Sequence, residues 1–307
     1  MSDILRIATR KSPLAIWQAE EVQRHLKKAG ADSELMRMST RGDEILNQPL
    51  AKIGGKGLFI KELERGMLNG DADIAAHSMK DLPSVFPEGL HLGAIMKREN
   101  PTDAFVSNHF EQIADLPPDA VVGTCSLRRR CQLLAKYPHL AVKDLRGNVN
   151  TRLAKLDSGR FDAIILASAG LIRLGLQERI KSEIDMDIML PACAQGAVGI
   201  ECKTDDSRIN ALLTNLHDAD TATRIHCERS LNATLGGSCQ TPIAAYAELD
   251  GDTLHLRARV GTPDGSTLLV AEDNDNRNNA VELGHRVGQR LLAEGAQKII
   301  DDLALPT

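Results

Sequence analysis

The chain has 307 residues, a net charge of -5, 42% hydrophobic residues and 26% charged residues. This composition excludes a disordered or fibrous protein, and the length predicts two or three domains. Six cysteines are too few for a disulfide framework, and their spacing to histidine does not predict a metal site. The mild acidity and the 3% aromatic content argue against nucleic-acid binding. With no secretory signal and no apolar run long enough to span a membrane, we expect a cytoplasmic protein.

Short strands and amphipathic helices alternate through the first half of the chain. Apolar runs predict strands at residues 4–8, 34–38, 73–76, 120–123, 141–145 and 163–166. Apolar spacings of three and four predict helices at residues 13–29, 57–69, 127–136 and 149–156. This alternation is typical of βαβ units and predicts mostly parallel sheets.

The last ninety or so residues follow a different pattern. Apolar and polar residues alternate over residues 253–260, and a turn with Pro263 and Gly265 leads to a partner strand at residues 267–271. Residues 281–293 have the spacing of one helix. The pattern predicts a small α+β domain.

Polar loops follow several of the predicted strands, where α/β domains bind their ligands. Arg10, Arg128 and Arg146 each come shortly after a strand. Since a guanidinium binds carboxylate or phosphate in a bidentate manner, these loops predict an anionic ligand with several such groups. A solvated helix face is the alternative for the arginine run at residues 128–130.

Three other features fit either a structural or a functional role. The run GGKG at residues 54–57 lacks the spacing of a nucleotide-binding loop and is typical of a flexible loop. Asp81, next to Lys80, would cap a turn or stabilise developing positive charge. Cys239 lies on a glycine-rich loop, where a thiol is better placed to react than Cys202 on its apolar strand, although most free cysteines are inert.

Five segments in a fixed order resemble the porphobilinogen deaminase family. They are LRIATR (residues 5–10), KIGGKGLF (52–59), HSMKDLP (77–83), LRGNV (145–149) and the loop around Cys239. The resemblance implies two periplasmic-binding-protein-like α/β domains around a cleft and a smaller C-terminal α+β domain. Domain 1 would span residues 1–98, with residues 197–217 returning to it, domain 2 residues 99–196, and domain 3 residues 218–307.

The resemblance also implies an activity. The family condenses four porphobilinogen molecules head to tail, with release of ammonia, into the linear tetrapyrrole hydroxymethylbilane. The chain grows on a dipyrromethane cofactor held by a thioether, which the match assigns to Cys239, and Asp81 matches the catalytic aspartate. We expect a monomer without bound metal. The alternative is a non-catalytic anion-binding or sensor protein with the same two lobes, which would leave Asp81 and the loop thiol without a purpose.

The motif match further assigns side chains to the carboxylates and rings of cofactor and substrate. Those expected to contact the cofactor are Lys80, Asp81, Ser126, Arg128, Arg129, Arg146 and Arg152. Those expected to contact the substrate are Arg10, Ser12, Lys52, Lys56, Phe59, Ser78, Arg173 and Gln195. Small residues depart from the family pattern at Cys125, Ala194 and Ser238, where serine, glycine and glycine are usual, and activity is expected in spite of them.

Overall fold

The computed structural model describes residues 4–39, 60–238 and 240–304. The chain forms two compact units, the first made of residues 1–99 and 196–222 and the second of residues 100–195 and 223–307. The second unit therefore contains both a central α/β region and the C-terminal region.

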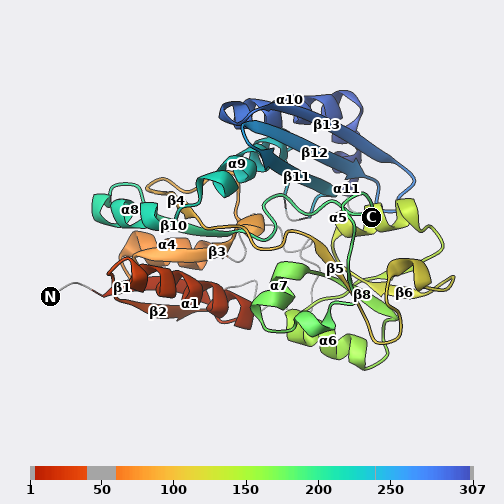
Figure 1. Ribbon diagram of the computed structural model, residues 1–307, viewed down its shortest axis with the longest axis horizontal. Helices are drawn as coiled ribbons and strands as arrows, with labels where there is room; N and C mark the ends of the chain where they lie inside the picture. The colour runs from red at the N-terminus through yellow and green to blue at the C-terminus, as the bar shows by residue number, and fades with distance from the viewer. Residues whose placement is uncertain (1–3, 40–59, 239, 305–307) are drawn as a thin grey trace. The chain divides into compact units, whose positions relative to one another are not determined.

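The first unit is built on a five-stranded sheet of order β2-β1-β3-β10-β4 (Figure 1). Its strands are β1 (Leu5–Arg10), β2 (Ser33–Met38), β3 (Ile74–Ser78), β4 (Leu90–Ile95) and β10 (Val198–Lys203). Its helices include α1 (Pro13–Lys28), α4 (Lys61–Asn69), α8 (Ser207–Leu213) and the 3-10 turns η1 (Met79–Asp81) and η4 (Thr214–Leu216). Strands β1, β2 and β3 are parallel, whereas β10 runs antiparallel to both of its neighbours, β3 and β4.

Helix α1 shows how local sequence sets these elements. The Ser12 side chain accepts a hydrogen bond from the Ala15 amide at 3.4 Å, and Pro13 occupies the first turn, where its missing N–H is not needed. The apolar face is buried, and Gln18 is buried on that same face. A polar residue on the core face of a helix indicates a special role for its side chain.

The second unit repeats this sheet plan, with strand order β7-β6-β8-β5-β9. Its strands are β5 (Asp103–Ser107), β6 (Val121–Gly123), β7 (Ala141–Lys143), β8 (Ala163–Ala167) and β9 (Ser182–Glu183), and its 3-10 turns are η2 (Ile113–Asp115) and η3 (Gln177–Arg179). Its helices are α5 (Leu127–Lys136), α6 (Val149–Asp157) and α7 (Ser168–Arg173). Strands β6, β7 and β8 are parallel and β5 is antiparallel, so the loops into α5, α6 and α7 share one sheet edge with the start of β5.

The C-terminal region is a three-stranded antiparallel sheet with helices (Figure 1). Its elements are α9 (Ala219–Thr234), β11 (Ile243–Asp250), β12 (Thr253–Gly261), β13 (Leu268–Asn276), η5 (Arg277–Asn279), α10 (Ala280–Ala293) and α11 (Ala296–Ala304). The predicted hairpin and the helix after it are confirmed as β12, β13 and α10. Alternate residues of β12, including Leu254, Leu256 and Ala258, enter one apolar core with Leu283 and Val287 of α10.

Several strands were not predicted from the sequence. Strands β5 and β10 are five or six residues long and almost wholly buried, so neither shows the alternation by which a half-exposed strand is recognised. Each also contains a buried carboxylate, Asp103 in β5 and Glu201 in β10, which interrupts the apolar run by which a buried strand is recognised in the sequence.

The turn between β12 and β13 packs against helix α5. Arg130 donates through Nε to the Pro263 carbonyl at 3.2 Å. Gly265 has φ +74°, and a Cβ there would lie 2.6 Å from the carbonyl carbon of Leu134. Gly265 is therefore required both by its backbone conformation and by the close approach of α5.

We predict that Gly265→Ala destabilises the protein by roughly 2–4 kcal/mol, because left-handed strain and overpacking add. Gly251→Ala is the matched control, since Gly251 also has a left-handed φ, +56°, but no described atom within 4 Å of an added Cβ. The control should cost only about 1–2 kcal/mol. Urea unfolding of both variants measures the difference, and equal losses would show that the contact with α5 is unimportant.

Candidate active site

A pocket in the first unit gathers four of the predicted site residues. Arg10 ends β1 and Ser12 caps α1, whereas Ser78 ends β3 and Asp81 ends the turn η1. Because β1 and β3 are parallel neighbours, their carboxyl ends meet at one sheet edge. The pocket therefore combines a guanidinium, two hydroxyls and a carboxylate.

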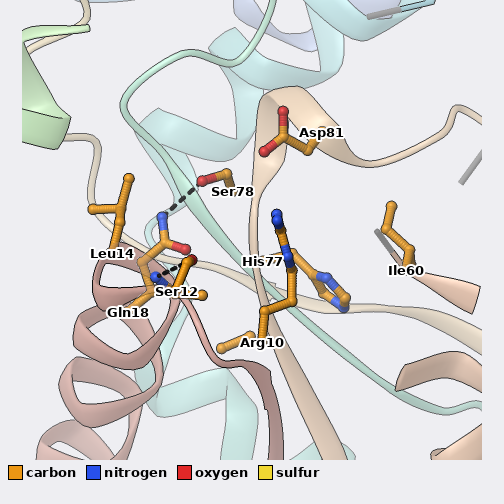
Figure 2. A pocket seen from close by; sticks show the side chains of 10 residues that line it. Arg10, Ser12, Leu14, Gln18, Ile60, His77, Ser78 and Asp81 are labelled. Atoms are coloured by element: carbon orange, nitrogen blue, oxygen red, sulfur yellow. Dashed lines mark hydrogen bonds between the residues drawn. The ribbon is translucent and has the colours of Figure 1, made fainter. Parts of the chain in front are cut away.

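The sequence reasoning missed two polar residues of this pocket, Gln18 and His77. Gln18 is 3% exposed and donates from Nε2 to the Ser78 hydroxyl at 2.8 Å, which Figure 2 shows as a dashed line. That bond fixes the Ser78 hydroxyl next to the turn with Asp81. The available signal was the polar residue on the buried face of α1.

Asp81 ends the turn η1, in which the Leu82 amide donates to the Met79 carbonyl at 3.3 Å. Its side chain is half-buried and faces the pocket, and Lys80 in the same turn is also half-buried. The predicted residues Lys52, Lys56, Phe59 and Cys239 lie outside the described residues.

The second unit holds a buried charge cluster at the matching sheet edge. Asp103 is fully buried at the start of β5, and its carboxylate accepts from Arg128 Nη1 at 2.6 Å and from Arg129 Nη2 at 2.8 Å. The two guanidiniums are themselves 4% and 5% exposed, and they also donate to the main-chain carbonyls of Leu190 and Ile165. The arginine run is thus not a solvated helix face at its first two positions.

Burial and charge act in opposite directions on this cluster. Burial would raise the pKa of Asp103, but the charges and hydrogen bonds of Arg128 and Arg129 hold it well below its usual range. Burial lowers the pKa of Arg129, and the Asp103 charge offsets part of that effect. One carboxylate faces two guanidiniums, so this pair of cations favours a further anion.

Gln195 belongs to the same cluster. Its amide is 1% exposed and donates to Asp103 Oδ1 at 3.0 Å and to the Pro101 carbonyl at 2.8 Å. The structure therefore gives Gln195 a supporting contact, and its predicted contact with substrate stays a prediction. Next to it, Ala194 has φ +63°, the left-handed conformation that explains the glycine usual at this position in the family.

The remaining predicted residues of the second unit lie in the loops and helices at this same edge. Ser126 caps α5, where its hydroxyl accepts from the Arg129 amide at 3.4 Å. Arg146 lies 3.7 Å from the Asp144 carboxylate, and Arg152 donates to the Gly147 carbonyl at 2.7 Å. Arg173 is buried at the end of α7. The loops and helices that follow β6, β7 and β8 therefore hold five predicted arginines: Arg128, Arg129, Arg146, Arg152 and Arg173.

Each sheet thus carries cationic and hydroxyl side chains at the edge where its parallel strands end. This arrangement defines an α/β protein with two five-stranded sheets, each lined at one edge by groups that suit an anionic ligand, and a smaller α+β region at its C-terminus.

Comparison with protein families identifies the group more narrowly. Residues 5–211 match the family described as porphobilinogen deaminase, dipyromethane cofactor binding domain, and residues 222–293 match porphobilinogen deaminase, C-terminal domain. The chain belongs to the porphobilinogen deaminase family. It is a transferase of tetrapyrrole synthesis with a dipyrromethane cofactor, and the predicted fold class is confirmed.

Solved structures of binding proteins show a weaker likeness. The periplasmic VFT2 domain of BvgS from Bordetella pertussis is 16% identical, with a TM-score of 0.42 over 70% of this chain and 87% of that chain. A putative methionine-binding lipoprotein from Bacillus subtilis is 14% identical, with a TM-score of 0.43 over 71% and 91%. The methionine-binding protein MetQ is 14% identical, with a TM-score of 0.45 over 70% and 91%.

The described residues contain neither a membrane-spanning helix nor a metal-binding cluster. No helix among them is long and apolar enough to cross a membrane. In the same part of the chain, no group of three or more histidine, cysteine, aspartate or glutamate side chains is arranged to hold a metal ion.

We predict that Asp103→Asn destabilises the protein by roughly 3–5 kcal/mol, because it leaves two guanidiniums buried without their carboxylate. Since the folded-state pKa of Asp103 lies below its unfolded value near 3.8, its contribution is complete above about pH 4 and is lost as the pH falls through the folded-state pKa. The unfolding free energies of wild type and variant should therefore begin to converge below about pH 4.

Asp157→Asn is the control, because Asp157 pairs with Arg179 at 2.6 Å on the surface. Its loss should cost less than about 1 kcal/mol. Urea titrations between pH 3 and pH 7 distinguish the two carboxylates, and a similar loss in both variants would contradict the role of the buried cluster.

Proposed function

We propose that this chain is a hydroxymethylbilane synthase. It would condense four porphobilinogen molecules head to tail, with loss of ammonia at each step, on a dipyrromethane attached through a thioether to Cys239. The observation that supports this most directly is the pocket in which the Asp81 carboxylate lies with Arg10, Ser12 and Ser78. A non-catalytic anion-binding protein needs the cation and the hydroxyls of this pocket but not the carboxylate.

The residues of the second unit fit a cofactor with several carboxylates. Two buried guanidiniums share one carboxylate, and Arg146, Arg152 and Arg173 lie in loops and helices that follow strands of the same sheet. The acetate and propionate groups of a dipyrromethane would supply the missing negative charge, and Ser126 would add a hydrogen bond. The contact of Lys80 with the cofactor stays a prediction from the family motif. When bound, the dipyrromethane supplies the free pyrrole carbon to which the first substrate is joined.

Arg10, Ser12 and Ser78 would bind the carboxylates of porphobilinogen, and Gln18 would keep the Ser78 hydroxyl in place. These contacts would orient the pyrrole so that its N–H faces Asp81. Lys52, Lys56, Phe59, Arg173 and Gln195 stay predictions from the family motif. The cytoplasmic location and the monomeric state also stay predictions.

Asp81 would act on the charge that develops when ammonia leaves. The aminomethyl group reacts in its protonated form. Its carbon–nitrogen bond breaks, the electron pair leaves with neutral ammonia, and the pyrrole nitrogen donates its lone pair to the ring. The resulting azafulvenium keeps the positive charge, and a carboxylate that accepts a hydrogen bond from its N–H would stabilise it. After the new carbon–carbon bond forms, the attacking pyrrole loses its α-proton, which Asp81 would accept.

We predict that Asp81→Asn lowers kcat by about 10²–10³-fold, because the amide keeps the shape but not the charge. KM for porphobilinogen should change far less, since the carboxylate-binding side chains remain. The matched control is Asp71→Asn, which removes an exposed carboxylate after α4. Steady-state kinetics measures both, and near-normal turnover of a folded Asp81→Asn variant would remove Asp81 from the mechanism.

We also predict that the intact mass of the purified protein shows one covalent adduct of two pyrrole units, and that peptide mapping places it on Cys239. Thiolate character and exposure decide which cysteine reacts, and burial raises the pKa of Cys131 and Cys202 to about 11. Cys239→Ala should lack the adduct and be inactive, whereas Cys125→Ser should keep both. An unmodified mass in active protein, or an adduct on another cysteine, would end this assignment.

A further inference from the structure

Strand β10 carries a buried carboxylate that the proposed chemistry does not use. Glu201 is fully buried, and its Oε2 lies 3.0 Å from Nε2 of His77, which is 6% exposed. His77 lines the pocket and immediately precedes Ser78. The pair therefore lies directly behind the turn that presents Asp81.

The strand register brings the two side chains together. His77 is opposite Gly199, and Glu201 is opposite Ala75, so His77 and Glu201 project from the same face of the sheet. Helix α4 packs against β3 and β10 and contributes Glu64, which is 8% exposed. Burial, and then the charge of Glu201, raise the pKa of Glu64, while His77 and Lys61 lower it.

Charged groups from the two neighbouring elements, β10 and α4, surround His77. Glu201 faces it from β10, and Glu64 and Lys61 face the cluster from α4. Arg10 and Asp81 line the same pocket. Two carboxyl groups therefore lie close to one imidazole on the buried side of the pocket.

His77 and Glu201 contact each other without a directional hydrogen bond. Neither Glu201 oxygen accepts a hydrogen bond from another described residue. A buried carboxylate needs a polar partner to offset its lost hydration. His77 Nε2 faces Oε2 at 3.0 Å, so this contact links the end of β3 to β10.

Strand β10 supports the turn in two further ways. The Met79 amide donates to the Ala197 carbonyl at 3.0 Å, just before β10 begins. A side chain at Gly199 would collide with Sδ of Met79, so the glycine makes room for the turn to pack on the strand. The turn η1 is therefore held against β10 by a main-chain hydrogen bond, by packing at Gly199 and by the contact between His77 and Glu201.

We propose that Glu201, acting through its contact with the His77 ring, is a positioning residue for the turn that carries Ser78 and Asp81. Replacing the Glu201 carboxylate weakens the contact that holds the end of β3, so the turn opens more often and Asp81 leaves its productive position more of the time. The effect should fall on kcat more than on KM. The kinetic part of this inference rests on the proposed function, whereas its structural part does not.

The test compares Glu201→Gln, His77→Gln and the double variant with wild type. Glu34→Gln is the control, because it removes an exposed carboxylate from β2 of the same sheet. Amide hydrogen exchange of residues 77–82 measures opening of the turn without any substrate, and porphobilinogen consumption gives kcat and KM. Thermal unfolding shows whether each variant is folded.

In Glu201→Gln we expect exchange over residues 77–82 at least about tenfold faster than in wild type. The value of kcat should be about 10–100-fold lower, with KM changed less than about threefold. The double variant replaces the contacting pair by two amides that can bond each other. Its kcat should therefore be about fivefold or more above the value expected if the two single losses multiplied.

Wild-type exchange and wild-type kcat in folded Glu201→Gln would overturn the inference, and so would additive losses in the double variant. A loss of kcat without faster exchange would also overturn it, because Glu201 would then not act by holding the turn. If wild type fails to consume porphobilinogen, the proposed function is wrong, and hydrogen exchange alone still decides the role of Glu201.

Discussion

Each five-stranded sheet depends on a carboxylate buried in its fourth strand, the one that runs antiparallel to its inner neighbours. In the second unit this carboxylate is Asp103 of β5, which neutralises Arg128 and Arg129. In the first unit it is Glu201 of β10, which faces His77. Both carboxylates hold a polar partner close to the edge where the parallel strands end. Removing such a carboxylate leaves its buried partner without a contact, and at Asp103 it leaves two buried guanidiniums uncompensated, which is why we expect large effects from these positions.

The two antiparallel strands also explain how the chain assembles two similar sheets. Strand β10 is separated from its partners β3 and β4 by about a hundred residues of sequence, which include the first sheet of the second unit. It places the Ala197 carbonyl against the Met79 amide and Glu201 against His77. The turn with Asp81 is therefore formed from local sequence but held in place by a distant segment.

The two units carry different chemical groups at the edges where their parallel strands end. In the first unit a half-buried carboxylate lies in a pocket with one guanidinium and two hydroxyls, which suits a reaction that develops positive charge on an anionic substrate. In the second unit guanidiniums outnumber the carboxylate that they share, which suits firm binding of an anionic cofactor. One unit is thus equipped to stabilise a cation and the other to neutralise anions.

The elements with local signals could be predicted from the sequence. Helix α5 has the predicted bounds because Ser126 caps it and Pro138 follows it, and the hairpin β12–β13 is recognised by its alternation and by the turn at Gly265. The family motifs placed Arg10, Ser12, Ser78 and Asp81 in one site, and the structure brings these four together. Motif order was also sufficient to identify the family.

Other features depended on tertiary contacts. Gln18 and Glu201 are ordinary polar residues in the sequence, and only packing shows that one bonds Ser78 and the other pairs with His77. The arginine run at residues 128–130 is compatible with a solvated helix face until the fold buries Asp103 beside it. The sequence by itself determined helices such as α1, α5 and α10, the hairpin and the family, because capping, periodicity and motifs are local. The tertiary structure decided which charges are buried and which partners they have, because burial and pairing depend on segments that lie far apart in the sequence.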